Sequence, residues 1–377
     1  MTTTRSILDV HVIQTVPPSN LNRDDSGSPK SAMYGGVRRA RVSSQSWKRA
    51  IRLDFTATLA PSEVGVRTKR LVEMVAEAMV VASPDTEMDD ALDMAADVLN
   101  AAGIGNKVPK KARKTESDKS IAEADALAFL SIAQVQALAA YALEVRTAGG
   151  KPEKKTAIRL ADTQHSIDIA LFGRMVASNP DLNTDAACQV AHALSTHPVA
   201  TEFDYYTAVD ERKPSEESGG AGMLGVIEFN SATLYRYATL DVDRLAQMLG
   251  ESDVTVAGAQ TFLRSMLTSM PSGKQNTFAN RTLPDAVVIT LRCDQSISYV
   301  GAFETPVTST AGRITASAVA LAEHATDMDG VFGMPPVQTW VIARSEVAQA
   351  LSALGARQPM TDVLAEIGSV LAARLAG

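Results

Sequence analysis

The chain opens with a run of β-branched and alternating apolar residues. The segment Ile7 to Val16 has the sequence ILDVHVIQTV, which is typical of a strand, and Pro17 and Pro18 predict that the strand stops there. The residues from Asn20 to Gly36 are mostly Asn, Asp, Ser, Gly and Pro. We therefore expect a loop after the first strand.

A short strand followed by a helix is predicted next. The residues Val37 to Val42 favour a strand, and Ser43 or Ser44 then suits the N-cap of a helix that runs to about Leu59. Strand, loop, strand and helix thus fill the first part of the chain.

From Pro61 to about Ala177 the apolar positions recur at helical spacing and alanine is frequent. The predicted helices of this block are Thr68–Val81, Asp89–Ala102 and Ile121–Glu144. Two polar, basic segments, Gly103–Ser120 and Thr147–Thr156, interrupt it. We interpret the block as an all-helical insertion.

The pattern then returns to strands. Val199 to Ala208 alternates apolar and polar residues, and Met223 to Tyr237 also favours a strand. A charged and then Gly-rich loop, Asp210–Gly222, separates the two, so we expect a long hairpin arm. The remaining predicted elements are a helix near Val256–Met270, a strand Ala286–Arg292, a helix Ile314–Ala325, a strand Val337–Ala343 and a helical tail.

Strands and helices at both ends of the chain, with a helical block between them, predict an α+β domain split by an insertion. The N-terminal and C-terminal segments should then share one sheet.

Composition places the chain in a broad class. Of its 377 residues 45% are hydrophobic, which suits a globular protein with a core. We find no signal peptide and no apolar run long enough for a membrane span, and we expect no membrane partner. With two cysteines, Cys188 and Cys293, a disulfide framework is not expected, so the sequence predicts a cytoplasmic protein.

Charge changes the picture. The net charge is −7, yet residues 1–52 carry nine Lys and Arg against three Asp, a local charge of +6. A basic segment on an acidic chain is compatible with phosphate binding at one face.

Helix geometry directs this charge. At 100° per residue, four side chains of the predicted helix share an arc about 100° wide: Gln45, Lys48, Arg49 and Arg52. Trp47, Ile51 and Phe55 form a separate apolar arc. The serines at the helix start suit a phosphate, and Arg23 and Lys30 of the preceding loop can close over it. The alternative is a solvated helix face without a ligand.

The same residues carry a resemblance to a known family. The strings LNRDD and RRARVSSQSWKRA, separated by a loop with YGG, resemble the CasC family, the backbone subunits of the type I-E CRISPR Cascade complex. Similar strings return later, in order, as DIALFGRMV from Asp168, DYYTAVD from Asp204 and YRYA from Tyr235.

The resemblance implies a fold shaped like a right hand. It has an RRM-like (ferredoxin-type) palm, a large helical fingers insertion and a long β-hairpin thumb. The implied boundaries are palm 1–60, fingers 61–180, a palm connection 181–198, thumb 199–235 and palm 236–377.

It also implies a function. The protein would be a non-enzymatic subunit of an antiviral surveillance complex. Copies of it would form a helical filament along the spacer of a CRISPR RNA, kink that guide periodically and present its bases to target DNA, together with other Cascade subunits. No cofactor and no metal are implied.

The residues implied or predicted to bind RNA lie mainly in the basic segment. They are Asn22, Arg23, Lys30, Arg41, Ser43, Ser44, Gln45, Lys48, Arg49 and Arg52, with Met175 of the FGRM string and with Lys274 and Gln275 of the string MPSGKQN. The thumb residues that would kink the guide are Tyr205, Tyr206 and Val209.

Two lysine clusters have two open interpretations: solvated loops, or contacts with target DNA phosphates. They contain Lys107, Lys110, Lys111, Arg113 and Lys114, and then Lys151, Lys154 and Lys155.

Three other interpretations concern a ribonuclease site, a zinc site and a scaffold function. Asp24 and Asp25 are either turn residues or the metal ligands of a ribonuclease. Cys188, His192 and His197 lack a fourth zinc ligand nearby, which favours structural roles. A scaffold that binds only proteins is the third alternative.

Overall fold

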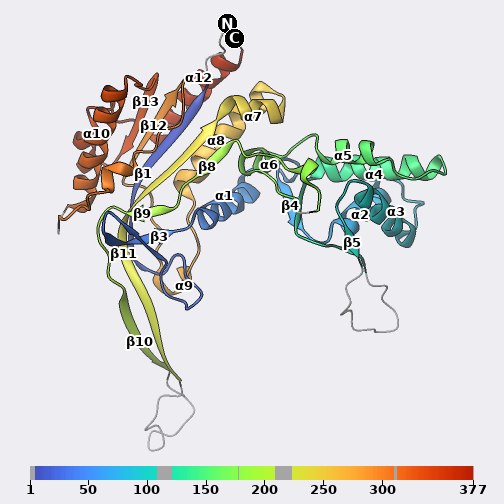
Figure 1. The fold of residues 1–377 in the computed structure, drawn as a ribbon, viewed down its shortest axis with the longest axis horizontal. Helices are drawn as coiled ribbons and strands as arrows, with labels where there is room; N and C mark the ends of the chain where they lie inside the picture. Colours follow the sequence, from blue (N-terminus) through green and yellow to red (C-terminus); the bar gives the residue numbers. More distant parts are fainter. Residues whose placement is uncertain (1–4, 108–120, 177, 209–222, 310–311, 377) are drawn as a thin grey trace, which may run out of the picture. The chain divides into compact units, whose positions relative to one another are not determined.

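The computed structural model describes residues 5–107, 121–176, 178–208, 223–309 and 312–376 (Figure 1). The chain forms two compact units. The first comprises the described parts of residues 1–54, 189–242 and 259–377, and the second comprises those of residues 55–188 and 243–258. Each unit is described by itself below.

The first unit is built on an antiparallel sheet whose strand order differs from their order in the sequence. Its strands lie in the order β13 (Gln338–Ala343), β12 (Ala286–Arg292), β1 (Ile7–Ser19), β11 (Met223–Asp241), β9 (Ala193–Ser195), β3 (Val37–Val42) and β2 (Ser31–Tyr34). Two further strands, β8 (Cys188–Val190) and β10 (Glu202–Ala208), also pair with β11. The first strand thus lies between strands from the second half of the chain, as the predicted shared sheet requires.

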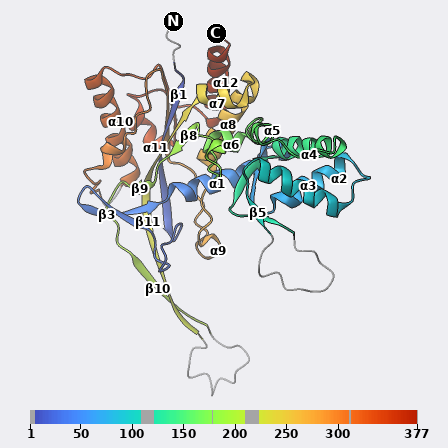
Figure 2. The same cartoon turned by 45° about the vertical axis from the view of Figure 1, so that its right-hand side comes forward.

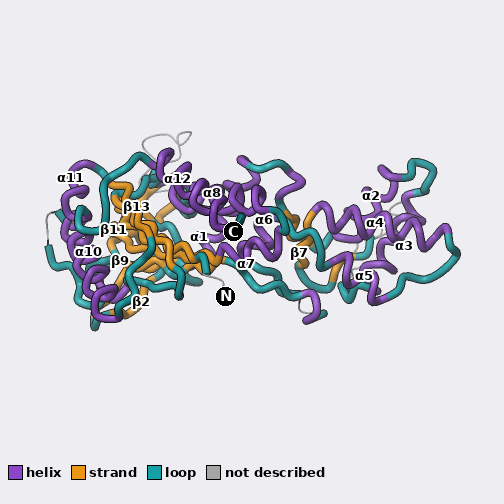
Figure 3. Tube along the Cα trace, turned by 90° about the horizontal axis from the view of Figure 1, so that it is seen from above, coloured by secondary structure: helices purple, strands orange, loops and turns teal. Residues whose placement is uncertain are grey.

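Helices cover both faces of this sheet. Figure 3 shows α10 (Arg313–Phe332) and α11 (Ser345–Ala348) on one side of the strands, and α8 (Ser252–Thr268) and α12 (Met360–Leu375) on the other. Under α10 the buried side chains of Ile13, Tyr235 and Val288 form one core cluster with residues of the helix. The alternation of side chains along each strand sends neighbouring residues to opposite faces, so β11 serves two cores.

The predicted stop at Pro17 and Pro18 is wrong. The strand β1 continues to Ser19, and its register with β11 shifts between Val16 and Ser19. Prolines lack the backbone N–H that a regular ladder needs, and they are tolerated at such an irregularity.

The long hairpin is formed by β10 and the first part of β11, paired from Glu202 with Phe229 to Ala208 with Met223. The second part of β11 pairs with β1, ending with Ile7 opposite Asp241. Figures 1 and 2 show the hairpin extending away from the sheet as a two-stranded arm. The predicted loop Asp210–Gly222 lies outside the described residues.

The second unit is mainly helical. Its helices are α2 (Leu71–Ala82), α3 (Met88–Ala101), α4 (Ile132–Thr147), α5 (Lys154–Ala161) and α6 (Ile167–Phe172). The apolar faces of α2 to α5 share one core, which includes Val75, Leu99 and Leu138. Four helices packed in this way agree with the helical spacing of the sequence.

The prediction of an all-helical insertion is nevertheless wrong in detail. Two small sheets form in the second unit, β4 (Gly65–Thr68) with β7 (Ala128–Ser131), and β5 (Asn106–Lys107) with β6 (Glu123–Ala124). The predicted helix Ile121–Glu144 therefore begins only at Ile132, where Ser131 caps it by accepting from Gln134 N.

The remaining helices are short or link the parts of the chain. They are α1 (Ser44–Thr58), α7 (Val242–Leu249), α9 (Gln275–Phe278) and the 3-10 turns Pro61–Glu63, Pro180–Leu182, Val300–Phe303 and Gln349–Leu351. Within the described ranges, none of the helices combines the length and the apolar character that crossing a membrane demands.

Candidate nucleic-acid interface

The start of α1 is tied to the loop before β2. The Ser43 Oγ accepts a hydrogen bond from Ser46 N at 3.3 Å, and Ser43 N donates to Asn22 Oδ1 at 2.9 Å. Ser43 is buried, so it acts here as the N-cap that the sequence predicts. Both Ser43 and Asn22 thereby fix the helix start against the loop.

The helix α1 has the two faces that its sequence predicts. Trp47, Ile51 and Phe55 are buried. The side chains of the neighbouring polar arc are exposed or half-exposed: Gln45, Lys48, Arg49 and Arg52. An apolar anchor on one side thus leaves a cationic stripe on the other.

The loop before β2 is held by its own side chains. Asn20 Nδ2 donates to the carbonyls of Gly27 and Glu228, both at 2.9 Å, and Lys30 N donates to Asn22 O at 2.8 Å. Asn20 is thereby buried while Arg23 stays exposed. A loop with a fixed base presents its cations from defined positions.

Asp24 closes the tip of this loop. Its Oδ1 accepts from Ser26 Oγ at 2.7 Å, from Ser26 N at 2.9 Å and from Ser28 N at 3.0 Å. These bonds, that of the Ser26 hydroxyl foremost, lower the pKa of Asp24 below its usual value. The geometry is that of an Asx turn.

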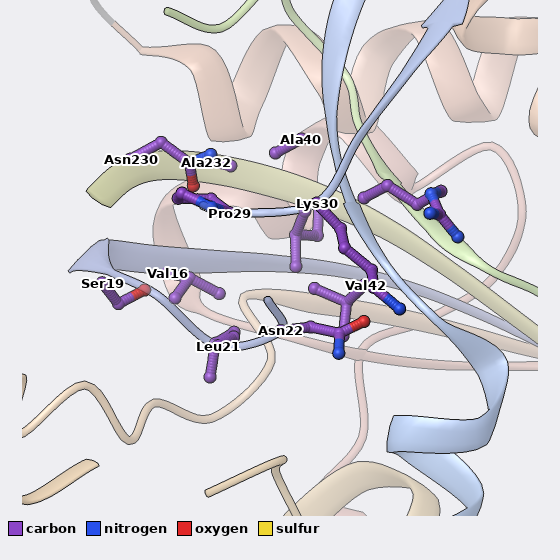
Figure 4. Close-up of a pocket in the computed structure, with 12 residues that line it drawn as sticks. Val16, Ser19, Leu21, Asn22, Pro29, Lys30, Ala40, Val42, Asn230 and Ala232 are labelled. Atoms are coloured by element: carbon purple, nitrogen blue, oxygen red, sulfur yellow. The ribbon is translucent and has the colours of Figure 1, made fainter. Parts of the chain in front are cut away.

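A small pocket joins the loop to the sheet. In Figure 4 the apolar side chains of Val16, Leu21 and Val42 line it together with the polar Asn22 and Lys30. Arg41 belongs to the same wall. Two cations and an amide thus surround one concave spot beside the start of α1.

His192 also belongs to this cluster, although its sequence position groups it with Cys188 and His197. Its Nδ1 accepts from Ser44 N at 3.3 Å and lies 3.4 Å from Arg41 Nη1. Burial, together with Arg41 and Lys30, lowers the pKa of His192. A neutral imidazole therefore accepts the hydrogen bond of the first backbone N–H of α1. The pairing of β9 with β3 brings His192 to this position.

The loop after α8 also reaches this cluster. A Cβ on Gly273 would lie 2.2 Å from the Leu21 carbonyl oxygen, so only glycine allows this approach. The next residue, Lys274, has φ +53° and is half-exposed together with Gln275. The structure thus brings the predicted Lys274 and Gln275 beside the loop that carries Arg23.

Met175 lies in the second unit and is 78% exposed. Its neighbour Arg174 is buried and donates to the carbonyls of Leu182 and Ala161 and to Asp162 Oδ1 at 2.7 Å. The Arg174 side chain is thus held inside the unit, whereas the Met175 side chain is on the surface, as a nucleic-acid contact would require.

The hairpin presents its two tyrosines to opposite faces. Tyr205 is 62% exposed and is paired with the exposed Val226, next to the exposed Phe203. Tyr206 is 38% exposed, and its ring packs on Gly225. Adjacent strand residues cannot stack on the same base, which limits the predicted pair to one wedge residue per face. Val209 lies outside the described residues.

The lysine clusters are only partly described. Lys107 forms an ion pair with Asp125 at 2.6 Å, while Lys151 is exposed before α5. Lys154 and Lys155 are exposed in the first turn of α5, where the helix dipole disfavours cations. The other predicted contacts lie outside the described residues: Lys110, Lys111, Arg113 and Lys114.

In the described part of the chain, no group of three His, Cys, Asp or Glu residues is arranged to hold a metal ion. Cys188 and Cys293 are free thiols, and His197 is buried with Nε2 accepting from Thr233 N at 3.1 Å.

Comparisons with known proteins identify a family and similar solved structures. The model of the family described as CT1975-like protein matches residues 8–366. A chain of a structure described as "CRISPR RNA-guided surveillance complex, pre-nicking" is similar with a TM-score of 0.82 and 34% identity, over 98% of this chain and 100% of that chain. A second, described as "CRISPR RNA-guided surveillance complex", has a TM-score of 0.72 and 29% identity over 97% and 99%. No curated protein sequence matches the chain.

Proposed function

The chain belongs to the CT1975-like protein family, in agreement with its resemblance to CasC, and on this premise we propose that it is an RNA-binding subunit of a CRISPR RNA-guided surveillance complex. In this proposal the complex is a type I-E Cascade, and the ligand is its guide RNA.

One observation carries the proposal. The loop with Arg23 and Lys30, the start of α1 and the loop with Lys274 converge on one side of the first unit, although they come from distant parts of the sequence. Their shared chemistry is cationic and amide side chains. Such a site suits phosphate and ribose rather than base edges.

This chemistry fits a guide whose sequence varies. A subunit that grips the RNA backbone accepts any spacer, and the bases stay free to pair with target DNA. On the hairpin, Tyr205 would stack against a base and so kink the guide at regular intervals along a filament of identical subunits.

The second unit would then face the target. Lys151, Lys154 and Lys155 form an exposed basic cluster suited to sequence-independent contact with DNA phosphates. Met175 would lie near the guide. Other Cascade subunits would cap the filament.

We propose that the protein is not a nuclease. The supporting observation is that one carboxylate oxygen of Asp24 already accepts hydrogen bonds from Ser26 and Ser28 within the turn. The rival function is a metal-dependent ribonuclease that uses Asp24 or Asp25, and a protein-only scaffold is a second rival.

Two measurements separate these functions. Purified protein is incubated with labelled single-stranded RNA and Mg²⁺ or Mn²⁺, and we expect binding in a gel shift without cleavage. Metal-dependent cleavage that disappears in Asp25→Ala would establish the nuclease. A lack of RNA affinity, both alone and after co-expression with a guide, would instead favour the scaffold.

A further inference from the structure

Arg236 is an arginine of the first unit that is buried without a carboxylate partner among the described residues. Arg236, in β11, is 1% exposed. Its Nη1 donates to Gln14 Oε1 at 2.5 Å, its Nη2 donates to the Met266 carbonyl, and its Cζ lies 3.6 Å from the centre of the Trp47 ring. Among the described residues its partners are thus an amide, a carbonyl and an aromatic face.

The other two large buried arginines of the sheet have different surroundings. Arg39, in β3, donates to the carbonyls of Tyr34, Ser195 and Phe303. Arg292, in β12, lies 3.3 Å from Asp9 Oδ2 and 2.7 Å from Asp329 Oδ1. Its charge is therefore balanced inside the fold. At Arg236 burial lowers the pKa to about 9, and no neighbouring charge opposes that effect.

An unpaired buried charge disfavours folding, and an apolar side chain of similar volume is often as stable or more stable at such a position. Hydrogen bonds to Gln14 and to the Met266 carbonyl offset part of this cost, and the contact with Trp47 indicates a further role.

The contact with Trp47 links Arg236 to α1. Trp47 is buried in the first half of the helix, directly before Lys48. Because successive helical residues are separated by about 100°, the direction of the Trp47 ring sets the direction of the cationic stripe. A flat guanidinium against a flat indole fixes that direction better than an apolar contact does.

The charge of Arg236 acts on the same helix. It lies on the inner side of α1, away from water, where its field is less screened than that of a surface cation. A phosphate held on the outer side of the helix is therefore attracted by a group that never contacts it.

We propose that Arg236 is a positioning residue for RNA: it orients α1 through Trp47 and places a buried positive charge beneath the cationic stripe. The inference rests on the proposed RNA-binding function. It adds to that function a residue that lies outside the binding surface.

The first test compares Arg236→Met with the wild type, using the full chain and a fluorescein-labelled single-stranded RNA of mixed sequence. We expect an unfolding midpoint equal to or above that of the wild type, and an affinity about tenfold lower at low salt. The salt dependence of binding should keep its slope, because no side chain that displaces counterions has been removed. A folded variant with wild-type affinity would overturn the inference.

The second test uses Arg236→Lys, whose charge can titrate. Burial lowers the pKa of a lysine, so the ratio of variant to wild-type affinity should fall between about pH 6 and pH 9. Gln14 from β1, Trp47 from α1 and the Met266 carbonyl from α8 do not titrate in this range, and the ratio cancels the titration of His192. A ratio independent of pH would refute a role for the charge, and this test decides the matter if the methionine variant does not fold.

The third test needs no RNA. In a Trp340→Phe background Trp47 is the remaining tryptophan, and Arg236→Met should shift its emission spectrum. Unchanged emission would contradict the positioning role. If the wild-type protein itself binds no RNA, the proposed function fails, and the emission result then stands as a separate statement about α1.

Discussion

The ring of Tyr206 packs on the backbone of Gly225 across the hairpin, so closely that a Cβ at residue 225 would lie 2.4 Å from the ring carbon Cζ. The tyrosine next to it has no such cover, since Tyr205 points to the other face beside Val226. The two adjacent tyrosines therefore have different roles in the hairpin: one stabilises it and the other is available to a partner.

This difference predicts that the tyrosines are not interchangeable. In a guide RNA carrying 2-aminopurine, an unstacked base gives strong emission. When the 2-aminopurine is moved along the guide, its emission should rise at regularly spaced positions in the complex with the wild type. Tyr205→Ala should abolish these increases, because the Tyr205 ring would be the wedge that unstacks the base. Tyr206→Ala is the matched control and should retain the increase. The opposite pattern, with emission lost only in the Tyr206 variant, would place the wedge on the other face.

The cationic stripe of α1 predicts a salt effect. Lys48→Ala combined with Arg52→Ala should weaken RNA binding equally for all sequences, and the slope of log affinity against log salt should become shallower by about 1.4. The measurement is a fluorescence titration at several salt concentrations with two unrelated RNAs. A loss confined to one of the two RNAs would mean that α1 contacts bases.

The cap of α1 predicts a loss of stability. Ser43→Ala removes the acceptor for Ser46 N and should lower the free energy of unfolding by about 1 kcal/mol in urea denaturation. Ser44→Ala is the control, since the Ser44 hydroxyl does not cap the helix, and it should change stability by less than about half that amount. Equal losses in the two variants would argue against the assigned N-cap.

The close approach of Gly273 to Leu21 predicts that a methyl group is not tolerated there. Gly273→Ala should separate the two loops, weaken RNA binding and destabilise the protein by about 1–3 kcal/mol. Gly330, near the end of α10, has open space around its Cβ position, and Gly330→Ala should be neutral or stabilising by about 0.5 kcal/mol. Wild-type affinity in the Gly273 variant would exclude its loop from the interface.

His11 predicts an acid-sensitive fold. Burial, with a smaller effect of Arg292, lowers its pKa to about 3. The unfolded chain therefore binds a proton near pH 6.5 that the folded protein refuses, so this part of the stability is present above pH 6.5 and is lost as pH falls toward 3. Between pH 6.5 and pH 5 the loss approaches about 1.4 kcal/mol per pH unit.

The check is His11→Phe, which keeps a ring against Tyr299, stacked on His11 at 4.3 Å in the wild type. Urea denaturation across this pH range should show a smaller dependence on pH in the variant. The buried or half-buried His165 and His197, whose pKa values are also lowered, leave a residual dependence in both proteins. Parallel curves for the two proteins would rule out His11 as a source of acid sensitivity.

The sequence predicts local elements well where one segment contains all the information. The strand Ala286–Arg292 and the amphipathic helix α1 agree closely with the structure, because a buried run of β-branched residues and a capped 3.6-residue period are local signals. The strand Ala128–Ser131 was missed, since its three apolar residues fit a helix until Gly65–Thr68 pairs with the strand.

The candidate site divides in the same way. The basic segment could be predicted because its charge is concentrated in one stretch of the chain. His192 and Arg236 could not be placed, because a distant strand brings each of them to α1. Likewise the separation of Tyr205 from Tyr206 depends on the face of the hairpin, which the strand alternation gives only once the pairing with Gly225 is known.

The continuity of β11 has a mechanical consequence. Its 19 residues form one rod, about 60 Å long, whose outer part belongs to the hairpin and whose inner part is clamped between β1 and β9. Arg236 lies in the clamped part, and Val226 lies in the free part. A sideways force on the hairpin is therefore transmitted to the part of β11 that supports α1. The RNA contacts of the hairpin and those of α1 would then be mechanically coupled rather than independent.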